Sequence, residues 1–290
     1  MTKTKIIDGR AIAKEIQNDL TKKIQVLVDK NFVPRMAVVH IGDNPSTLSY
    51  IKSITKISLR LNINAEVYRI DKTESTNSAI KIIESLNQDS NINGIILQEP
   101  IPRSFEKGKI INAISPGKDI DCMTTSNLGR LMEGNFLFAP STPLGVLKIL
   151  EFEQIDVEGK HTVIIGRSNI VGKPLANLLL MKRKIGNATV TVCHSRTVNL
   201  KDFTRSADIL IVAIGKPNFI KGEMIKNGAV VIDVGINYIK DRDGKHKLVG
   251  DVDTDSVTGI ASFVTPVPGG VGPVTTMMLF DNLIKAIPNG

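Results

Sequence analysis

The feature that most constrains the fold is the stretch 164–174, Ile-Ile-Gly-Arg-Ser-Asn-Ile-Val-Gly-Lys-Pro. The apolar, β-branched run at 161–165 leads into it and predicts a buried strand. Apolar residues follow at helical spacing over 175–180, and Pro174 is placed to open that helix. A strand, a glycine-containing turn and a helix together can bind phosphate, because free backbone N–H groups at a helix start attract an anion.

Two glycines have separate tasks in this turn. Gly166 lets the chain turn where the strand ends, and Gly172 lets the backbone approach closely. The spacing is not G-x-G-x-x-G, so the general dinucleotide-binding fingerprint is not met. A tight turn that binds nothing therefore remains an alternative.

Length and composition set the class of protein. The 290 residues suffice for one large or two ordinary domains, and the 42% apolar content suffices for a core. No apolar run reaches the length of a membrane span, and residues 1–8 contain neither an apolar signal core nor an arginine-rich leader. Cys122 and Cys193 make no disulfide framework, and no Cys/His spacing resembles a metal site. We expect a soluble, cytoplasmic protein without a metal.

The net charge of +8 raises the question of an anionic partner. The basic residues are spread along the chain, and the aromatic content of 4% leaves few platforms on which bases could stack. We therefore expect no nucleic-acid partner. Small ligands that carry phosphate or carboxylate groups explain the net charge better than nucleic acid does. A basic, solvated surface with no specific partner explains it better than both.

The first part of the chain alternates strands and helices. We expect a first helix capped by Asp8, strands at 36–41, 64–70 and 92–98, and helices at 46–61, 77–86 and 105–114. This alternation predicts a parallel sheet covered by helices. Ligands bind at the carboxyl ends of such strands, which points to Gln98 and to the helix after Gly42.

A polar turn and a proline-rich junction follow. Asp119 and Asp121 have no neighbours that complete a metal-ligand set, so one ligand-facing aspartate is the better interpretation. The junction at 138–145 leads into a helix and marks a change in composition. We predict one domain over 1–140, with the C-terminal helix 273–290 packed back on it, and a second over 141–272.

The second part has the pattern of a Rossmann-like domain. Strands are expected at 161–165, 188–193, 207–214 and 229–234, with short helices between them. The second strand ends in His194-Ser195-Arg196, and Arg167 lies in the first turn, whereas an NAD site usually has a carboxylate at that strand end. Cationic and hydroxyl donors suit a 2′-phosphate, so we predict NADP as the cofactor.

The last motif, 263–276, contains three prolines and three glycines in 265–273. Such a segment is poorly suited to a helix or a strand, and we expect it to line a site, with a rigid connector as the alternative.

Together these motifs resemble the methylenetetrahydrofolate dehydrogenase/cyclohydrolase family, often called the FolD family. The resemblance covers nearly the whole chain, in family order, and its final motif is highly specific. It implies two α/β domains with a cleft between them, a homodimer, and tetrahydrofolate as the carrier of a one-carbon unit. The matching segments are Tyr50 after 42–45, then 98–102, 118–121, 141–145, 166–174, 232–236, 250–252 and 265–273.

The resemblance also implies roles for single residues. Tyr50 and Gln98 would lie at the folate's reacting carbon, and Asp121 would hydrogen-bond the pterin; these three form the predicted catalytic set. Pro266, Gly269 and Gly270 would lie along the folate and the nicotinamide. With the turn glycine and the basic strand end included, the predicted NADP-binding set is Gly166, Arg167, Ser168, Ser195, Arg196 and Ile236.

One departure concerns the chemistry. The family has a catalytic lysine four residues after the tyrosine, and this chain has Ile54 there. Each helical residue turns about 100°, so Lys52 and Lys56 lie about 200° away on the opposite face. Smaller departures are Glu99 for an apolar residue, Cys122 for a glycine and Ser141 for a common cysteine.

The departure separates the two reactions of the family. Hydride removal from the methylene bridge needs positioning and electrostatics, whereas addition of water to the methenyl cation needs a general base. The sequence therefore predicts an NADP-dependent dehydrogenase whose cyclohydrolase activity is weak or absent. The alternatives are a fully bifunctional enzyme that makes 10-formyltetrahydrofolate with another base, and a non-catalytic folate- or NADP-binding subunit.

Overall fold

The computed structural model describes residues 3–240, 244 and 246–288, and the chain divides into two units that we treat separately. The six-stranded unit comprises Met1–Glu15 and Thr142–Met278, and the three-stranded unit comprises Ile16–Ser141 and Leu279–Gly290. These bounds differ from the predicted 1–140 and 141–272, because the first residues and the start of the last helix belong to the six-stranded unit. The predicted ends at 1–2 and 289–290 lie outside the described residues.

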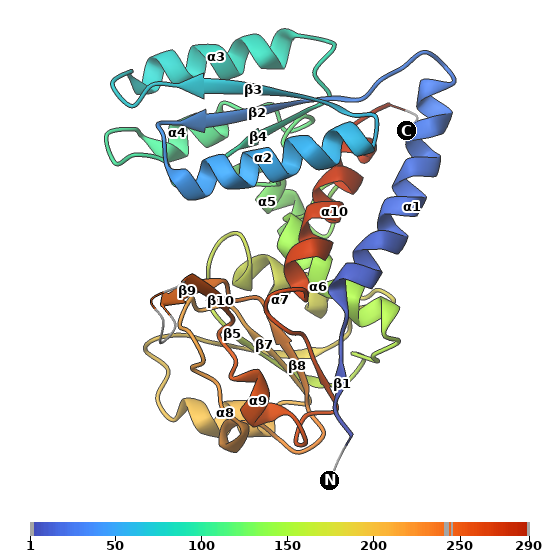
Figure 1. Ribbon diagram of the computed structural model, residues 1–290, viewed down its shortest axis with the longest axis vertical. Helices are drawn as coiled ribbons and strands as arrows, with labels where there is room; N and C mark the ends of the chain where they lie inside the picture. The colour runs from blue at the N-terminus through green and yellow to red at the C-terminus, as the bar shows by residue number, and fades with distance from the viewer. Residues whose placement is uncertain (1–2, 241–243, 245, 289–290) are drawn as a thin grey trace. The chain divides into compact units, whose positions relative to one another are not determined.

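The three-stranded unit contains a parallel sheet in the order β3-β2-β4 (Figure 1). Strand β2 pairs with both neighbours, so its side chains alternate between two covered faces. Ala37, Val39 and Ile41 point into a core with α3 and α4, which confirms the predicted helix-covered sheet. The elements are β2 (Arg35–Ile41), α2 (Pro45–Arg60), β3 (Asn64–Ile70), α3 (Thr76–Gln88), β4 (Gly94–Leu97), α4 (Lys107–Asn112) and α5 (Thr125–Glu133).

The six-stranded unit has the strand order β1-β11-β8-β7-β5-β6, with every neighbouring pair parallel. Strand β5 lies between β6 and β7, so the chain continues to one side and then to the other, and the carboxyl end of β5 is the switch point at which such sheets bind ligands. The strands are β1 (Lys5–Ile6), β5 (His161–Ile165), β6 (Thr189–Cys193), β7 (Ile209–Val212), β8 (Val230–Asp233) and β11 (Phe263–Val264).

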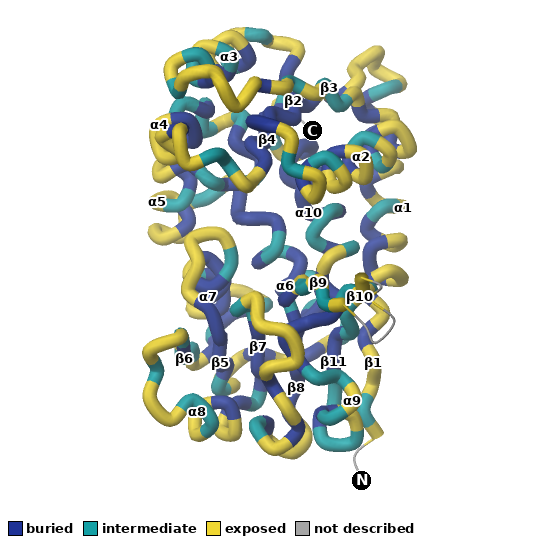
Figure 2. Tube along the Cα trace, turned by 60° about the vertical axis from the view of Figure 1, so that its left-hand side comes forward, coloured by how far each residue is buried: buried dark blue, intermediate teal, exposed yellow. Residues whose placement is uncertain are grey.

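Shorter elements complete this unit, and the central strands β7 and β8 are buried along their whole length (Figure 2). Val163, Leu210 and Val231 pack with residues of α8, α9 and the 3-10 helix in one apolar cluster. These elements are α6 (Ser141–Phe152), α7 (Gly172–Leu180), α8 (Leu200–Ser206), the 3-10 helix Gly222–Met224, β9 (Asn237–Lys240), β10 (His246–Val249) and α9 (Thr254–Val257). Helices α1 (Gly9–Val28) and α10 (Val271–Lys285) contribute residues to both units.

Three features depart from the sequence expectation. The N-terminal residues form β1, which pairs with β11, and nothing in the short polar sequence before Ile6 indicated a strand. The motif at 263–276 is irregular only over 265–270, because Phe263–Val264 is a strand and α10 begins at Val271 rather than near Pro273. Helix α5 lies in a segment for which we expected no element.

Two charged side chains shape the loop that ends at Asp121. Lys118 Nζ donates to the carbonyls of Leu86, Asn87 and Asp89, which satisfies the C-terminal end of α3. Asp119 is buried, and its carboxylate accepts four hydrogen bonds. The donors are Met123 N at 3.0 Å, Thr124 N at 2.9 Å, Thr124 Oγ1 at 2.7 Å and Asn127 Nδ2 at 2.9 Å. Asp119 is therefore structural, and that Asp121 faces a ligand stays a prediction.

Removing the Asp119 carboxylate should destabilise the protein. We expect Asp119→Ala to lower the free energy of unfolding by about 2–4 kcal/mol, because buried donors would lose their acceptor. Urea denaturation measures this change. Asp19→Ala, which removes an exposed carboxylate from α1, is the control and should leave the midpoint unchanged. Equal midpoints for both variants would contradict the structural role.

Candidate functional site

A hollow of about 300 Å³ lies at the carboxyl ends of β5, β6 and β7. Three strand ends supply its polar groups, as the switch-point rule predicts. Its mixed lining suits a ligand with both an aromatic ring and a phosphate. The lining residues are Ile165, Gly166, Arg167, Ser168, His194, Ser195, Leu200, Ala213, Ile214, Lys216 and Phe219. We call this hollow the β5–β7 hollow.

The glycine turn has the geometry that its sequence predicts. Gly166 has φ +132°, and a Cβ there would stand 2.3 Å from the Ala213 carbonyl oxygen. A Cβ at Gly172 would stand 2.1 Å from the Gly166 carbonyl oxygen. Both positions therefore exclude side chains, which confirms the predicted tight turn and close approach. Helix α7 begins at Gly172, two residues before the predicted start at Pro174.

The predicted cofactor residues fall into two groups. Gly166, Arg167, Ser168 and Ser195 line the β5–β7 hollow, whereas Arg196 and Ile236 are not part of its lining. Arg196 is exposed, and its backbone N–H donates to His194 Nδ1 at 3.1 Å. Contact between any of these residues and a cofactor stays a prediction.

A second hollow, of about 180 Å³, lies beside the loop 265–270. Pro266, Gly269 and Gly270, which the resemblance places along the folate and the nicotinamide, line it together with Ile236, which the resemblance assigns to NADP. Sequence reasoning missed Arg10, which also lines it. Gly9 explains this contact, because a Cβ there would stand 1.8 Å from the Gly270 carbonyl oxygen. The start of α1 therefore packs directly on the loop.

The predicted catalytic residues belong to the three-stranded unit. Gln98 follows β4, and its backbone N–H donates to the Val39 carbonyl at 2.8 Å, so it lies at the carboxyl end of the sheet. Asp121 follows Asp119, which bridges to β4 at Ile95. Tyr50 lies in the second turn of α2, whose first turn is capped by the Asn44 side chain.

Asp121 is the electrostatic centre of this group. Burial raises its pKa to about 7, and the carboxylates of Asp119 and Glu99 act in the same direction. The Ser141 hydroxyl opposes the shift by donating to Asp121 Oδ1 at 3.2 Å. Burial of the hydroxyl, followed by the charge of Asp121, raises the pKa of Tyr50 well above its ordinary value, although 40% of the tyrosine surface is exposed. Tyr50 is thus a neutral donor near pH 7.

Ile54 lies one turn after Tyr50 and is fully buried, with 0% of its surface exposed. Lys52 and Lys56 are exposed, which confirms that they lie on another face of α2. Among the described residues, the charged groups that shift the pKa of Asp121 are Asp119 and Glu99, and both are acidic. Glu99 itself pairs with Lys107.

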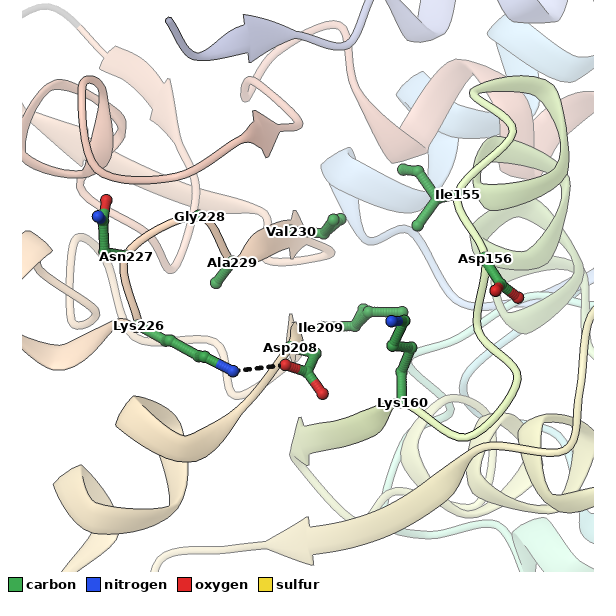
Figure 3. A pocket seen from close by; sticks show the side chains of 10 residues that line it. All are labelled: Ile155, Asp156, Lys160, Asp208, Ile209, Lys226, Asn227, Gly228, Ala229 and Val230. Carbon is green, nitrogen blue, oxygen red and sulfur yellow. Dashed lines mark hydrogen bonds and ion pairs between the residues drawn. The ribbon is translucent and has the colours of Figure 1, made fainter. Parts of the chain in front are cut away.

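A third hollow lies at the opposite, amino ends of β7 and β8 (Figure 3). Lys226 Nζ donates to Asp208 Oδ1 at 2.6 Å, and Asp208 Oδ2 accepts the His161 backbone N–H at 3.0 Å. Because Asp208 joins the starts of neighbouring strands, its charge serves the sheet. We therefore assign the candidate site to the carboxyl ends.

Two kinds of feature are absent from the described part of the chain. No three His, Cys, Asp or Glu side chains are grouped so that they could hold a metal ion. Within the same residues, no helix has the length and apolarity needed to cross a membrane.

Comparison with known proteins decides the family. The description "Tetrahydrofolate dehydrogenase/cyclohydrolase, catalytic domain" matches residues 7–121, and its "NAD(P)-binding domain" matches residues 140–289. This chain belongs to the tetrahydrofolate dehydrogenase/cyclohydrolase family. Its resemblance to that family in sequence motifs is thereby confirmed, as is the two-domain α/β fold.

Individual family members are similar over almost their full length. The bifunctional protein FolD of Campylobacter hominis is 45% identical over 284 residues, covering 98% of this chain and 97% of that protein. The crystal structure of the Campylobacter jejuni FolD has a TM-score of 0.92 at 41% identity, covering 98% of each chain. The Trypanosoma brucei FolD, complexed with NADP cofactor and inhibitor, has a TM-score of 0.92 at 34% identity, covering 99% of this chain and 98% of that one.

The Ser141 hydrogen bond makes a testable prediction about Asp121. In Ser141→Ala we expect the pKa of Asp121 to rise further above about 7, because the ionised carboxylate loses its donor. Carbon-13 NMR titration of labelled aspartate measures this. Ser85→Ala, at an exposed serine that donates to the Ile82 carbonyl, is the matched control. An unchanged or lower pKa in Ser141→Ala would contradict the assignment.

Proposed function

We propose that this protein is an NADP-dependent methylenetetrahydrofolate dehydrogenase with weak or absent cyclohydrolase activity. Two observations carry the proposal: the six-stranded unit has a complete glycine turn, and the three-stranded unit keeps Tyr50, Gln98 and Asp121 but has a buried Ile54. The reaction converts 5,10-methylene- to 5,10-methenyltetrahydrofolate. We further propose that the protein works as a homodimer, as the resemblance implies, and in the cytoplasm, as its sequence leads us to expect.

The choice of NADP is supported by the residues at the carboxyl end of β6. His194 and Ser195 line the β5–β7 hollow together with Arg167, and its lining contains no carboxylate. Close backbone packing excludes side chains at Gly166 and Gly172, and the resulting tight turn leads directly into α7, whose start suits a phosphate group. The related Trypanosoma brucei structure contains NADP. Gly166, Arg167, Ser168, Ser195, Arg196 and Ile236 are the residues that we propose hold it.

The oxidation depends on orientation and charge. When bound, NADP supplies the hydride acceptor. Tyr50 and Gln98 orient the folate, and the ionised Asp121 accepts hydrogen bonds from the pterin. Loss of hydride leaves a positive charge shared by the two bridge nitrogens of the folate. The acidic groups Asp121 and Glu99 favour that charge, and no proton has to move in the step.

Hydrolysis has different requirements. Addition of water to the methenyl carbon releases a proton, and a positioned base contributes about 10²–10⁴-fold to such a step. Ile54 has no basic atom, and Lys52 and Lys56 lie on the exposed face of α2. Tyr50 has a raised pKa and therefore holds its own proton near neutral pH. Hydrolysis, which needs a base more than hydride removal does, therefore lacks the lysine that would supply it.

One observation favours a fully bifunctional enzyme as the second candidate. The pKa of Asp121, raised to about 7 by burial, is close to the value at which a carboxylate works best as a general base near neutral pH. In that case Asp121 would take a proton from the attacking water, and 10-formyltetrahydrofolate would be the product. The two candidates differ in the fate of the methenyl intermediate.

The deciding experiment follows methenyltetrahydrofolate by its absorbance, with purified protein, methylenetetrahydrofolate and NADP. We expect the methenyl product to accumulate and to decay at its rate in buffer alone. Decay that scales with enzyme concentration would support the bifunctional candidate. Absence of NADPH formation, with both ligands still bound, would support a non-catalytic subunit instead.

Restoring the lysine should separate the two activities. We expect Ile54→Lys to raise the cyclohydrolase rate by at least about tenfold, because it restores a basic side chain one helical turn after Tyr50, where the family resemblance implies one. Ile54→Met is the control for disturbed packing, because it keeps an apolar side chain of similar volume. Equal cyclohydrolase rates in both variants would show that the missing lysine is not the cause.

The raised pKa of Asp121 predicts how folate binding depends on pH. Protonation removes the acceptor, so the KM for methylenetetrahydrofolate should rise as the pH falls through about 7, whereas the KM for NADP should not. In Ser141→Ala the midpoint of this rise should move to higher pH. Steady-state kinetics between about pH 6 and pH 9 would test this, because that range brackets the pKa of Asp121. A KM for methylenetetrahydrofolate that does not change with pH would contradict it.

A further inference from the structure

Lys216 is a cation in the β5–β7 hollow to which neither the motifs nor the family resemblance assigned a role. It belongs to the loop that follows β7, and it lines the hollow together with Phe219. Its Nζ lies 5.3 Å from the centroid of the Phe219 ring, within the range of a cation–π contact. Among the described residues, no carboxylate pairs with it. Its charge is therefore available to a ligand.

Asp251 holds the backbone that carries Lys216. The aspartate is fully buried, with 0% of its surface exposed, and both of its carboxylate oxygens accept hydrogen bonds. Oδ2 accepts from Ile214 N at 2.7 Å and from Gly215 N at 3.0 Å. Oδ1 accepts from Lys216 N at 2.8 Å and from Asn237 Nδ2 at 2.9 Å. Three consecutive backbone donors are thus fixed by one side chain, and the loop has little freedom.

The position of the loop indicates which part of a dinucleotide Lys216 would meet. In Rossmann-like folds the pyrophosphate lies against the turn after the first strand, and the adenosine ribose lies at the end of the second. These places correspond here to the turn after β5 and to Ser195 after β6, and both line the hollow that Lys216 lines. Phe219, Leu200 and Ile214 supply apolar surface suited to the adenine ring.

Charge balance favours the 2′-phosphate over the pyrophosphate. Helix α7 begins at Gly172, directly after the glycine turn, so the dipole at its start would favour the pyrophosphate there. A 2′-phosphate carries up to two further negative charges and needs cationic side chains. Arg196 lies outside the hollow's lining, so Arg167 and Lys216 are the lysine or arginine side chains that line it.

We propose that Lys216 binds the 2′-phosphate of NADP, and that Asp251 is the positioning residue that holds it there. This assignment rests on the proposed NADP-dependent function. It makes the loop after β7, in addition to the end of β6, a determinant of the preference for NADP over NAD.

Direct binding tests the assignment without folate chemistry. NADPH and NADH are titrated separately into the wild-type protein, Lys216→Met and Lys216→Arg, with nucleotide fluorescence as the signal. We expect Lys216→Met to raise the Kd for NADPH by at least about tenfold and to leave the Kd for NADH within about twofold. Lys216→Arg should keep most of the preference. Lys221→Met removes an exposed lysine of the same unit outside the hollow and should change neither Kd.

The outcomes separate this assignment from the proposed function. Tight NADPH binding that Lys216→Met leaves unchanged, or an equal loss of NADPH and NADH binding, would overturn the assignment alone. Wild-type protein that binds neither nucleotide would remove the proposed function and the assignment with it.

Asp251→Asn tests the positioning role. The amide NH2 of the new asparagine would face backbone N–H groups of residues 214–216 that now donate to the carboxylate, so the loop would lose part of its support. We therefore expect the ratio of the NADH to the NADPH dissociation constant to fall, as it does in Lys216→Met. In the double variant this ratio should fall no further, because both changes remove the same contact. Circular dichroism checks that each variant is folded. A ratio that Asp251→Asn leaves at the wild-type value, or additive losses in the double variant, would overturn the positioning role.

Discussion

Two buried carboxylates hold together the strand ends on which the candidate cofactor site depends. Asp233 ends β8, and its oxygens accept the backbone N–H groups of Gly235, Asp251 and Val252. Asp251 then accepts the N–H groups of the loop 214–216. A parallel sheet leaves donors unpaired where its strands end, and a buried unpaired donor is costly. The two carboxylates avoid this cost by accepting hydrogen bonds from these donors, although burial raises the pKa of Asp233 to about 6.

This arrangement explains why glycines accompany the aspartates in the sequence. A Cβ at Gly250 would stand 1.8 Å from Asp233 Oδ2, and one at Gly235 would stand 2.2 Å from Asp251 Cγ. Each glycine therefore makes room for the aspartate of the other segment. The motifs 232–236 and 250–252 are two halves of one interlocked structure. Apart from the proposed role of Ile236, their contribution to function is indirect, because they fix the loops that line the hollows.

The three-stranded unit uses carboxylates for two different purposes. Asp119 has four donors and no capacity left for a ligand. Asp121, two residues later, accepts a hydrogen bond from the Ser141 hydroxyl and from no other described residue, and burial raises its pKa to about 7. Without a lysine at position 54, the charges around Asp121 are acidic. Such surroundings favour a cationic product, whereas hydrolysis needs a base that position 54 does not supply, which is why we separate hydride removal from hydrolysis.

The amino-acid sequence by itself determined the local features of this protein. The alternation of apolar strands and amphipathic helices, the glycine turn at 166–172 and the identity of Ile54 are short-range properties, and the structure agrees with the first two. The sequence also indicated that Lys52 and Lys56 could not replace the lysine, because helical geometry is regular. These features depend on residues within a few positions of one another.

The tertiary structure alone decided which distant residues meet. Strand β1 exists because residues 5–6 pair with β11, more than 250 positions later in the chain. The different surroundings of Asp119 and Asp121 depend on α5 and on Ser141, and the place of Lys216 depends on Asp251. In each case a buried polar group needs a partner that folding brings from elsewhere in the chain. The pattern of residue types along the chain does not predict which distant residue becomes the hydrogen-bond partner of a buried polar group.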